Sequence, residues 1–218
     1  MIDSRKAPWI AEGYVEKRKM NNDLTSEHNR LYKEACTITQ GQIPLHDQPA
    51  LPSPNWLLAR KLRHAIALYE RVIDINPTNW SAMWLVGKVH QRFGELPEAL
   101  TWFERAHRTN PSQPDVVREA SICAMDMGST EKAIDYSLCA VRLEPSDGGL
   151  LANLALAYLL AGRITEAQKS INEALAAGPT DTISQAIGAM IGHFAANGRV
   201  PPTNTLALVK YWNRKRHA

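Results

Sequence analysis

Histidine, cysteine and one Gly-Lys pair are the residues of this chain that could take part in catalysis or bind a metal. The chain has seven histidines and three cysteines, but the histidines lack the His-x-x-x-His spacing with a nearby acid that is typical of a metal site. Gly87-Lys88 is not a phosphate-binding loop, because the earlier glycine of that motif is missing and Val89 stands where a Ser or Thr would hold magnesium. Cys36 has no evident histidine partner for nucleophilic catalysis. We therefore expect no catalytic residue, no metal and no cofactor, and we do not expect an enzyme.

The C-terminal tail carries a cluster of positive charge. No acidic residue follows Asp181, and two aromatic residues, Tyr211 and Trp212, interleave the cations. Such a cluster can contact nucleic acid, an anionic membrane surface or an acidic partner. It can also be a solvated helix end, with Leu206, Val209 and Trp212 packing back on the rest of the chain, and this second interpretation is the preferred one. The basic tail consists of Lys210, Arg214, Lys215 and Arg216.

Most of the remaining chain is built from a repeat. Residues 80–113, 114–147 and 148–181 share one 34-residue pattern with no insertion or deletion. A fixed period of this length is the signature of stacked structural repeats, which present extended concave surfaces to other molecules. Small residues recur where two helix backbones must approach closely, and a proline ends each repeat because it cannot continue a helix. The recurring residues are Gly94, Gly128 and Gly162, then Ala99, Ala133 and Ala167, then Ala106, Ala140 and Ala174, and finally Pro111, Pro145 and Pro179.

The register of these repeats resembles the tetratricopeptide repeat (TPR), whose pattern has a large residue, Leu-Gly, a tyrosine, and later Ala, Phe, Ala and Pro. The departures from the pattern are His90 and Ala124 at the tyrosine position and Ser137 at a usually bulky position, which predict looser packing in the middle repeat. The resemblance implies an all-α fold, a right-handed α-solenoid of stacked antiparallel helix pairs. The first repeat matches through Met83, Val86, Gly87, Ala99, Phe103, Ala106 and Pro111, and the third through Leu151, Leu154, Ala155, Tyr158, Ala167, Ile171, Ala174 and Pro179.

The flanks of the three repeats predict a partial repeat before them and a capping helix after them. Prolines at 49, 52 and 54 interrupt the expected first helix of an upstream repeat. Either a helix over Leu24–Thr39 replaces it, or a single long helix over Asn55–Asp74 caps the array, and the long helix is preferred. Downstream, Asp181 or Thr182 can cap a helix that ends near Asn197-Gly198. The expected segments are an arm at 1–53, a partial repeat or capping helix at 54–79, the repeats 80–113, 114–147 and 148–181, a capping helix at 182–199, and the basic tail at 200–218.

The resemblance also implies which side chains line the concave groove, because the first helix of each pair faces inward in this family. Aromatic and arginine side chains are common anchors of protein interfaces. We expect a cationic and aromatic half that would hold the acidic end of a partner peptide, and an apolar half near the third repeat. The alternative for Trp84 and the leucines is that they belong to the core. The expected groove residues are Trp84, Lys88, Arg92, Asp115, Arg118, Ile122, Leu156 and Leu160.

One subclass of the family binds the terminal carboxylate of chaperones, and this kind of ligand is disfavoured for the present chain. That subclass uses Lys and Asn on the first repeat, Asn on the second, and Lys with Arg on the third. The corresponding positions here are Trp84 and Lys88, then Glu119, then Gly149 and Asn153. Of the carboxylate-binding residues of that subclass, this chain keeps only the positive charge of Lys88, and Glu119 would repel a carboxylate.

Composition and repeat together lead to one expected function and one alternative. The net charge of +3 is too small to require a nucleic-acid ligand, and the apolar run from Gly149 to Gly162 is too short to cross a bilayer. Cys123 and Cys139 are expected to be buried thiols of a cytoplasmic protein. We expect a non-catalytic interaction module (an adaptor, assembly factor or dedicated chaperone) that binds a peptide or helix of a protein partner. The alternative is a structural subunit that self-associates, or that docks to an anionic or nucleic-acid complex through its tail.

Overall fold

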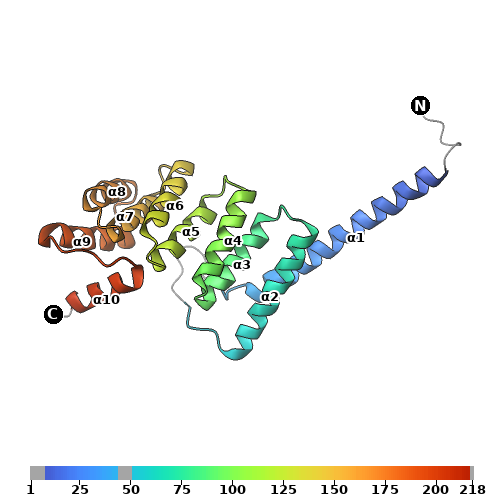
Figure 1. Cartoon of the computed structure of the whole chain (residues 1–218), viewed down its shortest axis with the longest axis horizontal. Helices are drawn as coiled ribbons and strands as arrows, with labels where there is room; N and C mark the ends of the chain where they lie inside the picture. Colours follow the sequence, from blue (N-terminus) through green and yellow to red (C-terminus); the bar gives the residue numbers. More distant parts are fainter. Residues whose placement is uncertain (1–7, 44–50, 217–218) are drawn as a thin grey trace. The chain divides into compact units, whose positions relative to one another are not determined.

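The computed structural model describes residues 8–43 and 51–216, and within them it contains ten helices and no strand. The helices divide into two compact units, Met1–Val89 and His90–Ala218, hereafter unit 1 and unit 2 (Figure 1). The boundary between the units falls within helix α3 (Trp80–Phe93). We describe each unit by itself.

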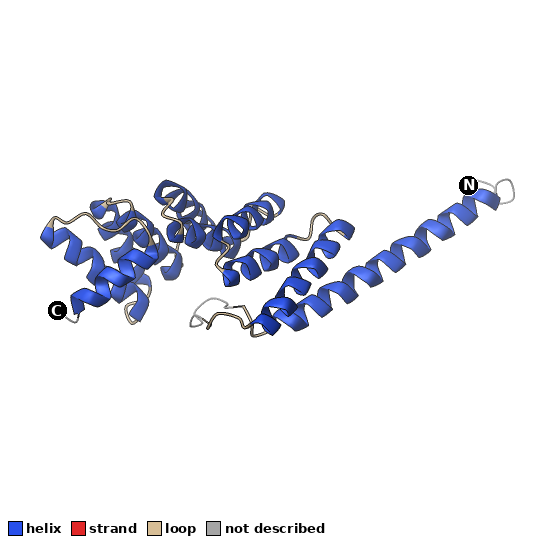
Figure 2. Ribbon diagram, turned by 60° about the horizontal axis from the view of Figure 1, so that its bottom comes forward, coloured by secondary structure: helices blue, strands red, loops and turns tan. Residues whose placement is uncertain are grey.

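Unit 1 is built on two long helices, α1 (Pro8–Thr39) and α2 (Trp56–Ile75), which pack against each other (Figure 2). In the C-terminal half of α1, Leu31, Ala35 and Thr39 are buried. Their spacing of four residues places them on one face of the helix. The side chain of Asn55 caps α2 by accepting a hydrogen bond of 2.9 Å from the backbone N–H of Leu58.

The structure combines the two sequence interpretations of this region. A long helix is expected over Asn55–Asp74, and α2 covers nearly the same residues. It does not act alone, however, because it packs along α1, which contains the alternative first helix, Leu24–Thr39. Part of the proline-rich connection lies at residues 44–50, outside the described residues.

Unit 2 contains the end of α3 and the regular helices that follow it. Helices α3, α5 and α7 begin at residues 80, 114 and 148, and α4, α6 and α8 begin at residues 96, 130 and 164, so the sequence period is also the period of the helices. Within the unit, α5 packs against α4, α6 and α7, and α7 packs against α6 and α8. The expected all-α repeat solenoid is confirmed. The helices of this unit are α4 (Leu96–Thr109), α5 (Pro114–Asp126), α6 (Thr130–Leu143), α7 (Gly148–Leu160) and α8 (Ile164–Ala177).

Two further helices, α9 (Thr182–Asn197) and α10 (Thr205–Arg216), end the chain. Helix α9 begins at the N-cap Asp181 and stops at Gly198, whose φ of 60° is left-handed, as glycine tolerates best. It packs on α7 and α8, so it caps the last repeat. Ile183, in the first turn of α9, is 58% exposed. The buried apolar residues of α9 are Ile187, Ile191 and Phe194.

The middle repeat has a hydrogen bond at the position where looser packing is expected. Ser137 is buried, and its Oγ lies 2.6 Å from the Oγ of Ser121 on the paired helix. The hydroxyl of Ser121 also donates a 3.1 Å hydrogen bond to the carbonyl of Ala133. A satisfied polar pair therefore stands in this core where the family pattern has a bulky side chain.

Candidate functional site

A pocket of about 470 Å³ lies in unit 1 between the C-terminal half of α1 and the N-terminal half of α3. Most of its lining is apolar. Helices α1 and α3 form it, and each is the first helix of a pair. The family resemblance places the ligand groove on such first helices, so the pocket lies where a ligand is expected. Its lining includes Tyr32, Cys36, Ser81, Trp84 and Leu85, together with Lys33, Thr37 and Gln40 at exposed positions.

Hydrogen bonds between helices fix one wall of this pocket. The hydroxyl of Tyr32 on α1 lies 2.8 Å from the Oγ of Ser81 on α3. Behind it, the hydroxyl of Tyr69 on α2 lies 2.9 Å from the Oγ1 of Thr39 and donates to the Sγ of Cys36 at 3.6 Å. Burial raises the pKa of both tyrosine hydroxyls above their ordinary value. Both phenols therefore stay protonated at neutral pH and hold the helices in register.

Trp84 is the expected groove residue that the structure places in this pocket. Its side chain is half-buried, and its indole Nε1 is buried with no hydrogen-bond partner among the described residues. A buried N–H without an acceptor is costly, so a ligand that brings an acceptor would gain that hydrogen bond. Lys88, one turn further along α3, is buried, with 3% of its surface exposed.

In unit 2 the expected groove residues range from exposed to fully buried. Arg118 is 7% exposed and forms an ion pair of 2.7 Å with the exposed carboxylate of Asp115 on its own helix. Leu160 is fully buried, and Ile122 and Leu156 are half-buried and pack against the same core cluster. The remaining member, Arg92, is half-buried at the end of α3.

The C-terminal helix α10 covers part of this face. Its Leu208 is 1% exposed and belongs to the core cluster against which Ile122 and Leu156 pack. The hydroxyl of Tyr211 is hydrogen-bonded to His193 Nε2 on α9 at 2.9 Å, and α10 also contacts α5. The tail therefore packs back on the solenoid. Of the three apolar residues expected to pack there, Trp212 lies against the ring of His193, whereas Leu206 and Val209 are exposed.

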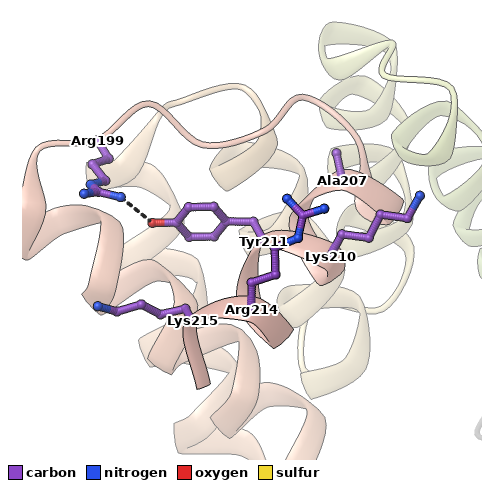
Figure 3. A pocket seen from close by; sticks show the side chains of 6 residues that line it. All are labelled: Arg199, Ala207, Lys210, Tyr211, Arg214 and Lys215. Carbon is purple, nitrogen blue, oxygen red and sulfur yellow. Dashed lines mark hydrogen bonds between the residues drawn. The ribbon is translucent and has the colours of Figure 1, made fainter. Parts of the chain in front are cut away.

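The basic tail and one arginine outside it form a second pocket, of about 480 Å³ (Figure 3). Lys210, Arg214 and Lys215 of α10 line it together with Arg199, which precedes α10. Arg199 Nη1 donates a 3.4 Å hydrogen bond to the hydroxyl of Tyr211. The fourth expected tail cation, Arg216, ends α10, and its side chain lies outside the described residues.

Sequence reasoning missed the α1 side of the first pocket and the arginine of the second. Tyr32 and Cys36 lie next to the buried Leu31 and Ala35. The four-residue spacing of these apolar residues could have predicted a packed helix here, but the proline-rich segment separates that helix from the repeats. Nothing in the sequence links Arg199 to the tail cations, because the chain must first turn back at Pro201-Pro202.

The described residues offer few other chemical groups. Among them, no three His, Cys, Asp or Glu side chains lie close enough together to hold a metal ion. Cys123 is buried as expected, whereas Cys139 is only half-buried, and the three cysteines are free thiols. In the same residues, we find no helix with the length and apolar character needed to span a membrane.

Comparison with solved structures shows the same fold in several proteins. Residues 41 to the end of MamA from Desulfovibrio magneticus RS-1 match with a TM-score of 0.61 and 13% identity, over 77% of this chain and 86% of that one. YrrB, described as a TPR protein with an unusual peptide-binding site, matches with a TM-score of 0.56 and 16% identity, over 75% and 84% of the two chains. The first TPR of RPAP3, bound to the HSP90 peptide SRMEEVD, matches with a TM-score of 0.52 and 16% identity, over 54% and 94%.

Sequence comparison gives one relative and one family. The 131 kDa subunit of transcription factor tau from Saccharomyces cerevisiae (strain ATCC 204508 / S288c) is 31% identical over 74 residues, which are 34% of this chain and 7% of that protein. This chain thus corresponds to a small part of that relative. The tetratricopeptide repeat family model matches residues 59–114 and 123–182, more than half of the chain. The chain belongs to the tetratricopeptide repeat family.

Proposed function

We propose that this chain is a non-catalytic adaptor that holds a segment of a partner protein in the pocket between α1 and α3. TPR domains are protein–protein interaction modules, so a protein is the expected kind of ligand. The observation that carries the proposal is Trp84: a large aromatic side chain at a groove position lines the pocket, and its buried indole N–H has no partner among the described residues.

The lining of the pocket favours an extended peptide with one apolar side chain. The apolar surface can bury that side chain, while a backbone carbonyl of the peptide accepts the Trp84 N–H. Lys33 at the exposed margin can pair with an acidic residue of the same peptide. Lys88 and Arg118 are poorly placed for that role because both are buried. Two proteins of the same fold support a peptide ligand by their descriptions, YrrB by its peptide-binding site and RPAP3 by its bound HSP90 peptide.

Selection from a random peptide library tests this proposal. The wild-type chain is used to enrich peptides, whose affinity is then measured for wild type, Trp84→Ala and Thr37→Arg. The second variant places a long charged side chain in the pocket from an exposed position on α1, so it does not disturb the core. Trp56→Ala is the matched control, since Trp56 lies in the same unit, is 76% exposed and does not line the pocket.

The expected result is that Trp84→Ala and Thr37→Arg weaken binding about tenfold or more, as substitution of an interface anchor does, while Trp56→Ala leaves it unchanged. Circular dichroism checks that the variants keep their helicity. Peptides that bind all four proteins equally, or a library that yields no specific peptide, would overturn the proposal.

A further inference from the structure

We infer that the pocket beside α10 is a second binding site, specific for an acidic peptide segment that carries one apolar side chain. This site lies in unit 2 and is separate from the pocket between α1 and α3. Its lining consists of Arg199, Ala207, Lys210, Tyr211, Arg214 and Lys215.

Positive charge converges on this pocket without local compensation. Four of its six lining residues are cations, and no acidic residue lines it or follows Asp181 in the sequence. Lys210 and Arg214, four residues apart, share one face of α10. Figure 3 shows Arg199 across the ring of Tyr211 from these two side chains, while Lys215 extends on the side of Arg199. Like charges held this close raise the local potential, which attracts an anionic ligand.

The floor of the pocket is largely apolar, although four cations line the pocket. The ring of Tyr211 lies at its centre, and the methyl group of Ala207 and the aliphatic stems of Lys210 and Arg214 add apolar surface. The ring is held in place, because it packs 5.2 Å from the ring of Phe194, centroid to centroid, and its hydroxyl is bonded to His193 and Arg199. A rigid aromatic floor bordered by cations fits an apolar side chain between two carboxylates.

The arrangement favours a peptide over nucleic acid. A nucleic acid is bound along a groove whose cations track successive phosphates and whose aromatic side chains stack with several bases. Here the cations surround one pocket, Tyr211 supplies the one aromatic ring among its described lining residues, and the second aromatic residue of the tail, Trp212, packs near the ring of His193. These features match one short acidic segment, in which the carboxylates supply charge complementarity and the apolar side chain fills the pocket.

The test uses the full chain and a fluorescein-labelled peptide with a central leucine flanked on each side by glutamates. Its affinity is measured by fluorescence anisotropy for wild type and for Lys210→Glu/Arg214→Glu. The matched control is Lys132→Glu/Lys169→Glu, which makes the same change in net charge at exposed lysines on α6 and α8. Three further probes are the peptide with glutamine for glutamate, the peptide with serine for the leucine, and labelled single-stranded oligothymidine.

We expect the glutamate peptide to bind wild type and the control, and to lose about tenfold or more in affinity for Lys210→Glu/Arg214→Glu. The glutamine and serine peptides should each bind more weakly. Four outcomes would overturn the inference: no binding of the glutamate peptide, equal loss with the control variant, equal affinity for the glutamine peptide, or tighter binding of the oligonucleotide.

Discussion

Two glycines of unit 2, Gly162 and Gly192, have different backbone conformations and therefore different substitution costs. Gly162 joins α7 to α8 with φ of 73°, whereas Gly192 lies inside α9, and a Cβ atom at either position would meet no neighbouring atom within 4 Å. Any change on substitution thus comes from the backbone. We expect Gly162→Ala to destabilise the fold by about 1–2 kcal/mol, the cost of a left-handed alanine, and Gly192→Ala to stabilise it by about 0.5–1 kcal/mol. Urea unfolding of both variants measures this, and a change of the same sign in both would contradict the explanation.

The N-cap of α9 makes one part of the stability depend on pH. The carboxylate of Asp181 accepts hydrogen bonds from the hydroxyl and N–H of Ser184 and from the N–H of Ile183, and the Ser184 hydroxyl is the main cause of the lowered pKa of Asp181. Because the pKa of Asp181 is lower in the folded chain than in the unfolded chain, the cap stabilises the fold fully at a pH above the pKa of the unfolded chain. This stabilisation is lost as the pH falls through the pKa of the folded chain.

We therefore expect Asp181→Ala to cost about 1 kcal/mol at neutral pH and less near pH 3, which lies below the pKa of an aspartate in the unfolded chain (about 3.9). Asp181→Asn should keep part of the cap at both pH values, because its single amide oxygen can still accept one of the two N–H bonds, which go to different carboxylate oxygens of Asp181. Chemical unfolding at the two pH values measures the difference. A cost of Asp181→Ala that stays constant across this range would show that the charge of Asp181 contributes nothing.

At the scale of elements, α10 is held far more weakly than the repeat helices. Leu208 is its one fully buried apolar side chain in the described residues, with Tyr211 and Trp212 half-buried, whereas α7 buries eight residues. Burying one leucine contributes roughly 1.5–3 kcal/mol. Helix α10 is therefore the element of unit 2 that opens most easily.

We expect Leu208→Asp to release α10 while the repeats stay folded, since a carboxylate cannot remain in the apolar cluster. Leu206→Asp, two residues away at a position that is 62% exposed, should leave α10 in place. Hydrogen exchange of the α10 amides measures the release, with the amides of α5–α8 as internal reference. Slow exchange of α10 in Leu208→Asp, or unfolding of the repeats with it, would contradict a weakly attached helix.

At the scale of the whole molecule, the repeats could be predicted because their signal is redundant. Glycine, alanine and proline at fixed spacing predict a 34-residue period, which the starts of α3, α5 and α7 keep, and Asp181 and Gly198 predict the bounds of α9. The pairing of α1 with α2 could not be predicted from the sequence in preference to a single capping helix. The two helices are separated by the proline-rich connection, and among the described side chains of α1 the buried ones are Leu31, Ala35 and Thr39.

The candidate sites were harder to predict because position on a helix face does not fix exposure. Trp84 lines a pocket, yet Lys88, one turn further on the same helix, is buried. Arg118 lies along its own helix to reach Asp115, and the apolar half of the expected groove is shared with Leu208 of α10. A repeat pattern predicts which side of a helix faces inward. It does not predict which other segment of the chain covers that side.

The equal length of the three repeats has a consequence for how such a chain can change through inheritance. Helices α3, α5 and α7 start at equivalent positions, as do α4, α6 and α8, so recombination between the corresponding stretches of the gene joins one helix pair to the next without a shift in register. Each such event adds or removes one whole layer of the solenoid. The pocket beside α10 lies outside the three repeats, whereas the pocket between α1 and α3 includes Ser81, Trp84 and Leu85 of the first repeat. An exchange that keeps the first repeat therefore changes the spacing of the two sites along the chain while each keeps its own residues.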